Sequence, residues 1–234
     1  PKKIMKILLN KNAGVCWGVE RAMDMADETI AQKQNEGREP IVSLGPLVHN
    51  PEVVDDFSQR GVEVIRTLDD VEFGTVIFRS HGVSLDLYEK AKARGLDVVD
   101  ATCPFVKRSQ NYGRRFSRMG YTVIAVGDQN HPEMKSVRSF IEGQYIITMD
   151  PKDVEKIPAD HTVGVIAQTT IPYSVFKAVI DACKQRFSEV KTHDTICDAT
   201  KIRKQEAAVL ARQADCMVII GGKNSSNTKK LLNI

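Results

Sequence analysis

Three cysteines stand at the same kind of turn, and this repetition constrains the fold more than any other feature of the sequence. Cys103 lies in Asp100-Ala-Thr-Cys-Pro104, between a run typical of a strand and a run typical of a helix. Pro104 suits the first position of a helix, where its missing N–H would have no partner. Cys16 and Cys197 also precede helical runs. The sequence therefore predicts three thiols at helix N-termini, where free N–H groups favour a thiolate.

Short apolar runs alternate with amphipathic runs through the chain. Segments 40–44, 75–78 and 121–126 are short and apolar, as buried strands are, whereas 19–34 and 106–119 have the periodicity of helices. This alternation predicts an α/β fold with parallel sheets whose faces are covered by helices. We expect two further strands at 4–9 and 214–220.

The same arrangement repeats along the chain. After each cysteine come a helix, a strand and a glycine turn, and the fourth residue after the glycine of that turn is His49, His131 or Ser225. A second half-unit follows in two repeats, where 75–82 matches 162–170. The third repeat has no such half before residue 234. We therefore expect three lobes related by a pseudo-threefold axis, at 1–102, 103–196 and 197–234, with the third lobe incomplete.

The composition is that of a globular protein in water, with 42% hydrophobic and 27% charged residues in a chain of 234. A net charge of +3 is too small to favour nucleic acid or a membrane surface. No apolar run approaches the roughly 20 residues of a membrane span, and residues 1–10 do not resemble a signal peptide. We expect a cytoplasmic protein whose five cysteines are thiols, ligands or catalytic groups.

The repeated turns follow strands, and α/β sheets bind ligands at the carboxyl ends of their strands. Three converging thiols would leave one position of a metal open, and thiolates also hold iron–sulfur clusters. Glu133 is the main acid nearby. The other turn residues are mostly hydrogen-bond donors, which suit an anion such as a phosphate group; they are His49, His81, His131, Ser225, Ser226 and Asn227.

Eight short motifs, in order along the chain, resemble those of the LytB/IspH family. They are Ala13-Gly-Val-Cys16-Trp-Gly18, Val48-His49-Asn50, Ser80-His81-Gly82-Val83, Asp100-Ala-Thr-Cys103-Pro104, His131-Pro-Glu133, Gln168-Thr169-Thr170, Cys197-Asp-Ala-Thr200 and Asn224-Ser225-Ser226-Asn227. The resemblance covers residues 6–232. It implies a three-lobed trefoil around an iron–sulfur cluster. It also implies an activity: the two-electron, two-proton reduction of (E)-4-hydroxy-3-methylbut-2-enyl diphosphate to isopentenyl and dimethylallyl diphosphate. This reaction is the last step of the non-mevalonate isoprenoid pathway.

The resemblance further implies roles for individual residues. Cys16, Cys103 and Cys197 would ligate a [4Fe-4S] cluster in which one iron has no protein ligand. Glu133 would be the proton donor, with Thr169 near the substrate hydroxyl. The substrate diphosphate would be held by His49, His81, His131, Ser225, Ser226 and Asn227. An external one-electron donor such as a ferredoxin or flavodoxin would supply the electrons. The family pattern includes one more diphosphate-binding serine, beyond residue 234.

Other interpretations of these residues remain open from the sequence. A zinc hydrolase could use Cys and His ligands, although no HExxH or paired CxxC spacing is present. A non-catalytic α/β module that binds a phosphorylated metabolite could use the same donors. Glu133 could simply oppose a helix dipole, as Glu52 could, since both follow a proline. Cys183 and Cys216 are expected to be core cysteines. Metal content separates the three functions: iron with sulfide, zinc, or none.

Overall fold

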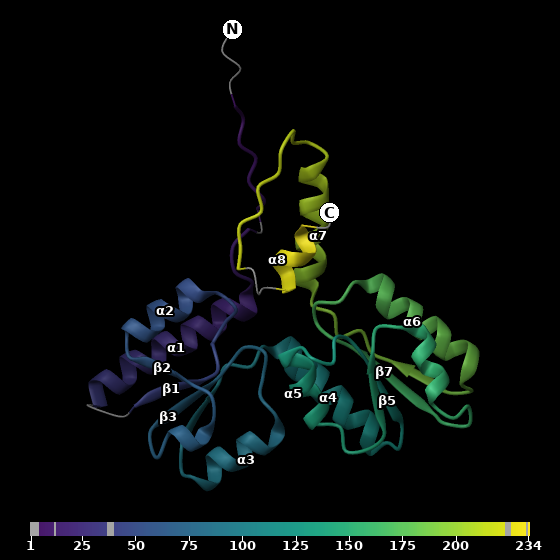
Figure 1. Cartoon of the computed structure of the whole chain (residues 1–234), viewed down its shortest axis with the longest axis horizontal. Coiled ribbons are helices and arrows are strands. Elements are labelled where there is room, and N and C mark those ends of the chain that lie inside the picture. The colour runs from purple at the N-terminus through teal and green to yellow at the C-terminus, as the bar shows by residue number, and fades with distance from the viewer. Residues whose placement is uncertain (1–4, 12, 37–39, 223–225, 233) are drawn as a thin grey trace.

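The structure, a computed structural model, describes all residues except 1–4, 12, 37–39, 223–225 and 233. Figure 1 shows two α/β parts side by side and a third, smaller part between and above them. The third part contains the segment near the N-terminus and the last helices of the chain. The three parts meet near the centre of the molecule, so side chains from all three can reach a common region.

The first part holds a parallel sheet with strand order β2-β1-β3-β4. Its strands are β1 (Ile41–Leu44), β2 (Val62–Ile65), β3 (Thr75–Phe78) and β4 (Asp97–Asp100). Its helices are α1 (Trp17–Glu36), α2 (Pro51–Gln59) and α3 (Leu85–Ala93), with a short 3-10 helix, η1 (Leu68–Asp70). Ile41 and Ile77 pack beneath α1 and α2, whereas Val42 and Val76 pack on the side of α3. The central strands β1 and β3 are buried throughout, which explains their continuous apolar runs.

The second part repeats this plan with strand order β6-β5-β7-β8. Its strands are β5 (Thr122–Val126), β6 (Tyr145–Thr148), β7 (Val163–Ala167) and β8 (Val190–Thr192). Its helices are α4 (Pro104–Arg118), α5 (Pro132–Ser139) and α6 (Tyr173–Arg186), with a 3-10 helix, η2 (Pro151–Lys156). Phe176 of α6 packs on one face of the sheet, and Phe116 of α4 packs on the other.

The two sheets confirm the repeat that the sequence predicts. All described strand pairs are parallel, and the strand order is the same in both sheets. The matched glycine turns also make equivalent hydrogen bonds. Gly45 donates its N–H to the carbonyl of Ile65 at 2.8 Å, and Gly127 donates to that of Thr148 at 2.9 Å. The α/β fold class is therefore confirmed in detail.

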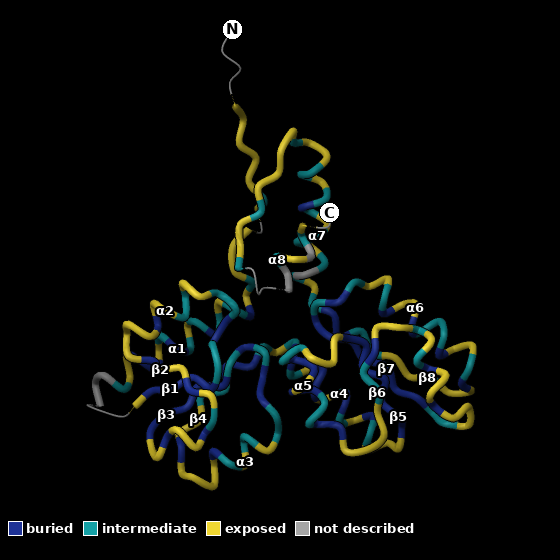
Figure 2. The backbone as a smooth tube through the Cα atoms, in the orientation of Figure 1, coloured by how far each residue is buried: buried dark blue, intermediate teal, exposed yellow. Residues whose placement is uncertain are grey.

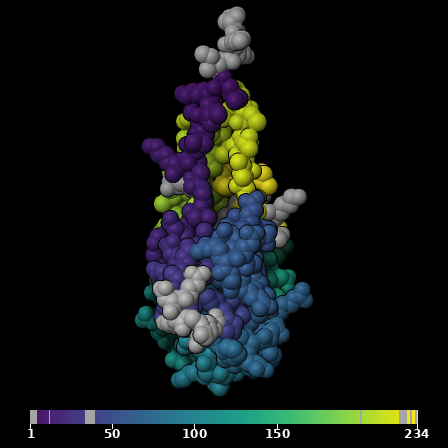
Figure 3. Space-filling model, turned by 90° about the vertical axis from the view of Figure 1, so that its left-hand side faces the viewer, coloured from purple at the N-terminus to yellow at the C-terminus, as the bar shows by residue number. Residues whose placement is uncertain are grey.

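The third part contains α7 (Asp198–Ala211) and α8 (Ser226–Leu231). The strands expected at 4–9 and 214–220 are wrong: residue 4 lies outside the described residues, and 5–9 and 214–220 form no strand. The two segments run side by side in Figures 1 and 3 and are mostly exposed in Figure 2. Apolar residues without a hydrogen-bonded neighbouring strand do not make a sheet. Cys216, expected in the core, is exposed for the same reason, whereas Cys183 is buried as predicted.

Two expectations concern the chain as a whole. Every helix in the described ranges is too short or too polar to cross a bilayer. All strands of the first sheet precede residue 103, and all strands of the second lie within 103–196. The lobe boundaries at 102/103 and 196/197 remain a prediction, because α/β parts in contact do not by themselves define independent units.

Candidate active site

The three repeated cysteines lie at helix N-termini, as the sequence predicts. Cys103 is the N-cap of α4, and Cys197 is the N-cap of α7. The carbonyl of Cys16 accepts the first hydrogen bonds of α1, from the N–H groups of Val19 and Glu20. Each thiol therefore begins a helix that belongs to a different part of the chain.

The structure brings these cysteines into one region. Cys16 and Cys197 both influence the Cys103 thiol electrostatically. The helix start that carries Cys16 lies against Cys103, because a Cβ on Gly18 would come within 2.6 Å of Cys103 Sγ. Glycine at position 18 thus leaves room beside this sulfur. The three thiols share one environment, which a common ligand requires.

Burial changes the chemistry expected for Cys103. The N–H groups of Phe105 and Val106 lower the pKa of the thiol, as expected at a helix N-terminus, but burial has the larger effect and raises it to about 11. Negative charge on Cys16 or Cys197 acts on this pKa in the same direction as burial. A free thiolate is therefore disfavoured here at neutral pH. A metal can stabilise it, because coordinated thiols are deprotonated.

A second group of side chains contains three histidines. His49 follows β1, His81 follows β3, and His131 is the N-cap of α5. The ring centroids of His49 and His81 are 4.2 Å apart, and those of His81 and His131 are 5.7 Å apart. Among the described residues, they form the one group of three His, Cys, Asp or Glu side chains whose possible metal-ligand atoms all lie within 4.8 Å of one another. The structure therefore brings together all three predicted histidines.

Burial and neighbouring cations favour the neutral form of two of these imidazoles, His81 and His49, in the absence of a ligand. The pKa of His81 is lowered to about 3, first by burial and then by His49, His131 and Arg79. The pKa of His49 is also lowered, by burial and by Arg79. An anion bound among the rings would raise these two pKa values again, since an adjacent negative charge favours the protonated form of an imidazole.

Glu133 is held at the edge of this histidine group. The residue is 1% exposed, and its carboxylate accepts two hydrogen bonds from Thr169. The backbone N–H of Thr169 donates at 2.6 Å and the hydroxyl at 2.7 Å. Glu133 in turn donates its own N–H to Nδ1 of His131 at 3.2 Å. The predicted acid and Thr169 are thus in direct contact.

Backbone hydrogen bonds connect the cysteines to this polar group. Cys103 donates its N–H to the carbonyl of Ser80 at 2.9 Å, and His81 is the next residue after Ser80. Cys197 donates its N–H to the carbonyl of Thr169 at 2.8 Å. These two equivalent bonds place the Cys103 turn beside Ser80 and His81, and the Cys197 turn beside Thr169.

The remaining predicted donors are Ser225, Ser226 and Asn227, of which Ser226 and Asn227 begin α8. Ser225 lies outside the described residues, as do the side chains of Ser226 and Asn227. The chain just before them is close to the histidines, since a Cβ on Gly222 would come within 2.8 Å of the carbonyl oxygen of His49. The third part of the molecule therefore reaches this region.

Arg79 is a site residue that the sequence reasoning missed. It lies between Phe78 and His81 and lowers the pKa of His49 and His81 by its charge. The sequence feature that could have indicated Arg79 is a cation directly after the apolar run of β3, a position where a residue that only packs would be apolar.

The comparisons with known proteins decide the family. A family model described as LytB protein matches residues 7–234. The chain belongs to the LytB family.

Relatives and solved structures agree with the LytB assignment. A curated relative from Geobacter sulfurreducens, 4-hydroxy-3-methylbut-2-enyl diphosphate reductase, is 45% identical over 98% of this chain and 80% of its own length. A relative of the same name from Trichlorobacter lovleyi is 43% identical over the same shares. A solved (E)-4-hydroxy-3-methyl-but-2-enyl diphosphate reductase, described as the terminal enzyme of the non-mevalonate pathway, is 36% identical with a TM-score of 0.79, covering 96% of this chain and 80% of that one. The reductase from Plasmodium falciparum is 28% identical with a TM-score of 0.85, over 94% and 70%.

Proposed function

We propose that this LytB chain reduces (E)-4-hydroxy-3-methylbut-2-enyl diphosphate to isopentenyl and dimethylallyl diphosphate, with loss of the allylic hydroxyl as water. The observation that carries this proposal is the pair of backbone hydrogen bonds from Cys103 to Ser80 and from Cys197 to Thr169. They join the thiol-bearing turns to a group that contains three imidazoles and a buried carboxylate. A redox centre beside an anion site and an acid is what this reaction needs.

The donor set of Cys16, Cys103 and Cys197 fits an iron–sulfur cluster. Thiolates are the usual ligands of such clusters, and three of them leave one iron open. The three sulfurs do not form a group within 4.8 Å, whereas the histidines do, and a cluster is larger than a single ion. When bound, a [4Fe-4S] cluster supplies single electrons and a Lewis-acidic iron for the hydroxyl.

The histidines are suited to hold the substrate diphosphate. His49, His81 and His131 each offer a ring N–H, and their pKa values rise when an anion binds next to them. The serines and asparagine proposed to complete this site are Ser225, Ser226 and Asn227. Binding the diphosphate at a fixed place orients the allylic alcohol relative to the acid, which lowers the entropic part of the barrier.

Glu133 is the proposed proton donor. Hydroxide is a poor leaving group, so a positioned acid assists cleavage of the C–O bond. The contacts with Thr169 fix the carboxyl group in one orientation. Thr169 therefore positions the acid and, through its hydroxyl, is suited to contact the substrate oxygen.

The proposed reduction consumes two electrons in every turnover, so another molecule has to supply them continuously. We propose an external one-electron donor such as a ferredoxin or flavodoxin, which would reduce the protein twice per turnover. The five cysteines are free thiols in the structure, which accords with a proposed location in the reducing cytoplasm.

Iron and sulfide analysis of anaerobically prepared protein tests the proposal, together with turnover of the diphosphate substrate. Cys103→Ser should lose most of the iron and abolish turnover. Cys216→Ser is the matched control, because Cys216 is an exposed thiol, and it should keep both. Zinc without sulfide would favour a hydrolase instead, and protein without metal would favour a non-catalytic binding module.

A further inference from the structure

A cavity of about 250 Å³ lies at the carboxyl edge of the first sheet, beside the histidine group but not lined by it. Its wall comes from the ends of β1, β2 and β3, the start of α3, and α5 of the second part. The lining residues on which the argument depends are Gly45, Arg66, Thr67, Arg79, Ser84 and Lys135.

The charges of this cavity have one sign. Arg66, Arg79 and Lys135 line it, and its lining contains no carboxylate. Among the described residues, none of these three cations makes an ion pair. The cavity therefore concentrates positive charge that the protein itself does not neutralise.

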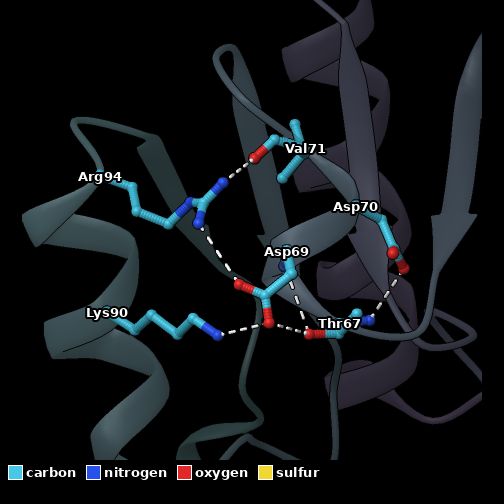
Figure 4. Close-up of polar contacts among 6 residues, drawn as sticks. All are labelled: Thr67, Asp69, Asp70, Val71, Lys90 and Arg94. Carbon is cyan, nitrogen blue, oxygen red and sulfur yellow. Dashed lines mark hydrogen bonds and ion pairs between the residues drawn. The ribbon is translucent and has the colours of Figure 1, made fainter.

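The nearby acid is already occupied. Asp69, two residues after Thr67, pairs with Lys90 at 2.8 Å and with Arg94 at 3.3 Å, as Figure 4 shows. It also accepts a hydrogen bond from the Thr67 hydroxyl at 3.1 Å. These contacts fix the Thr67 wall of the cavity and direct the carboxylate of Asp69 toward α3.

Arg79 shows that the cavity is built and not an accidental hollow. Its Nε atom is buried and has no hydrogen-bond partner. Burying part of a guanidinium group without a partner costs free energy, and the charge of an anion in the cavity would offset part of that cost. Gly45 makes room for this side chain, since a Cβ there would come within 2.6 Å of Arg79 Nη1.

We propose that this cavity binds a phosphate-class dianion, free or as the phosphate group of a small metabolite. Arg66 follows β2, Arg79 follows β3 and Lys135 lies in α5, so the charge comes from three elements. Guanidinium groups match the geometry of phosphate oxygens. Ser84 adds a hydroxyl that makes no capping hydrogen bond at the start of α3. None of the three histidines lines the cavity, although Arg79 lies close enough to act on two of them. The proposal does not depend on the proposed reaction.

Calorimetric titration with inorganic phosphate at low ionic strength tests this proposal. The intact protein should show two classes of site, one at the histidines and one in the cavity. Arg66→Gln combined with Lys135→Gln should weaken the cavity class at least about tenfold, since each substitution removes a charge-assisted contact. Both residues are exposed, so the double variant should fold. Lys92→Gln, on the exposed face of α3, is the matched control and should retain both classes.

His81→Asn separates the two sites, because it should weaken the histidine class and leave the cavity class intact. If His81→Asn leaves the histidine class unchanged, the proposed diphosphate site is wrong, whatever the result for the cavity. Glycerol 3-phosphate, titrated in parallel, distinguishes the source: tighter binding than inorganic phosphate assigns the cavity to a phosphate ester, and weaker binding assigns it to free phosphate. An unchanged second class in the double variant, or a parent protein without that class, would overturn the proposal.

Discussion

Glu52 and Glu133 occupy the same local position in two repeated helices, yet their environments differ. Each follows a proline at the start of its helix and donates its N–H to the side chain of the N-cap residue, Asn50 or His131. Glu52 is exposed, whereas Glu133 is buried against Thr169. The helix dipole acts on both, so only the tertiary contacts can give Glu133 a special role.

Glu133→Gln should reduce the rate of turnover by about 10² to 10⁴. The amide keeps the size of the side chain but cannot donate a proton as an acid does. Substrate affinity should change far less, because the proposed diphosphate ligands are the histidines and not Glu133. Single-turnover kinetics with prereduced protein measures this directly. Glu52→Gln should behave like the parent protein, and near-parent turnover of Glu133→Gln would place the acid elsewhere.

Stability should fall as the pH drops below about 6.5, the pKa of histidine in the unfolded chain. The folded-state pKa of His81 is about 3, so in this window the unfolded state binds a proton that the folded state does not. The lowered pKa of His49 acts in the same direction. Between pH 7.5 and pH 5, the free energy of unfolding of His81→Asn should therefore fall by about 2 kcal/mol less than that of the parent protein. Urea unfolding of the ligand-free protein at both pH values measures this; equal losses would contradict it.

Residue chemistry was only partly predictable from the sequence. The turns that carry Cys103 and His81 could be found because their local patterns repeat. The raised pKa of Cys103 and the lowered pKa of His81 could not, because burial by other parts of the chain causes both. Arg79 gave only a weak signal, a cation after a buried strand.

At the level of elements, periodicity predicted most of the two sheets and failed at their margins. β3 has the predicted bounds, because its four consecutive residues are all buried and the apolar run is short and continuous. β8 was missed because Val190–Thr192 is short and lies at the sheet edge, where two of its three residues are exposed. Segments 5–9 and 214–220 were assigned as strands because apolar composition alone does not reveal whether a pairing neighbour exists.

A buried hydroxyl joins elements of the first and second parts. Ser136 of α5 donates to the carbonyl of Val83, before α3, at 2.8 Å. It also accepts a hydrogen bond from Gln110 of α4 at 2.8 Å. Ser136→Ala leaves both partners buried and unsatisfied, which should lower the free energy of unfolding by about 1 to 3 kcal/mol.

Chemical denaturation followed by circular dichroism measures this loss. Ser58→Ala, at an exposed position of α2, is the control and should change stability by less than about 0.5 kcal/mol. A loss no larger than that of the control would mean that the two parts are joined by other contacts.

At the scale of the molecule, the histidine group combines contributions from separate parts. His49 and His81 come from the first sheet, His131 comes from α5, and Gly222 of the third part approaches His49. A diphosphate bound there would contact turns from more than one part. Ligand binding should therefore restrain all three parts together.

Hydrogen exchange with and without saturating pyrophosphate should show this restraint. Amides near His49, His81 and His131 should become protected together, because opening any one turn would require loss of the ligand. His81→Asn should weaken the protection in all of these turns. Protection confined to one turn would mean that the anion binds a single part.

The placement of Cys16, Cys103 and Cys197 at the starts of three different helices has a consequence for biogenesis. No single part of the chain can assemble the proposed metal centre, so the inorganic component can be inserted only after the parts have docked. Misassembled copies would then remain colourless. The brown absorbance per mole of polypeptide would report the fraction of a preparation that has reached its native arrangement.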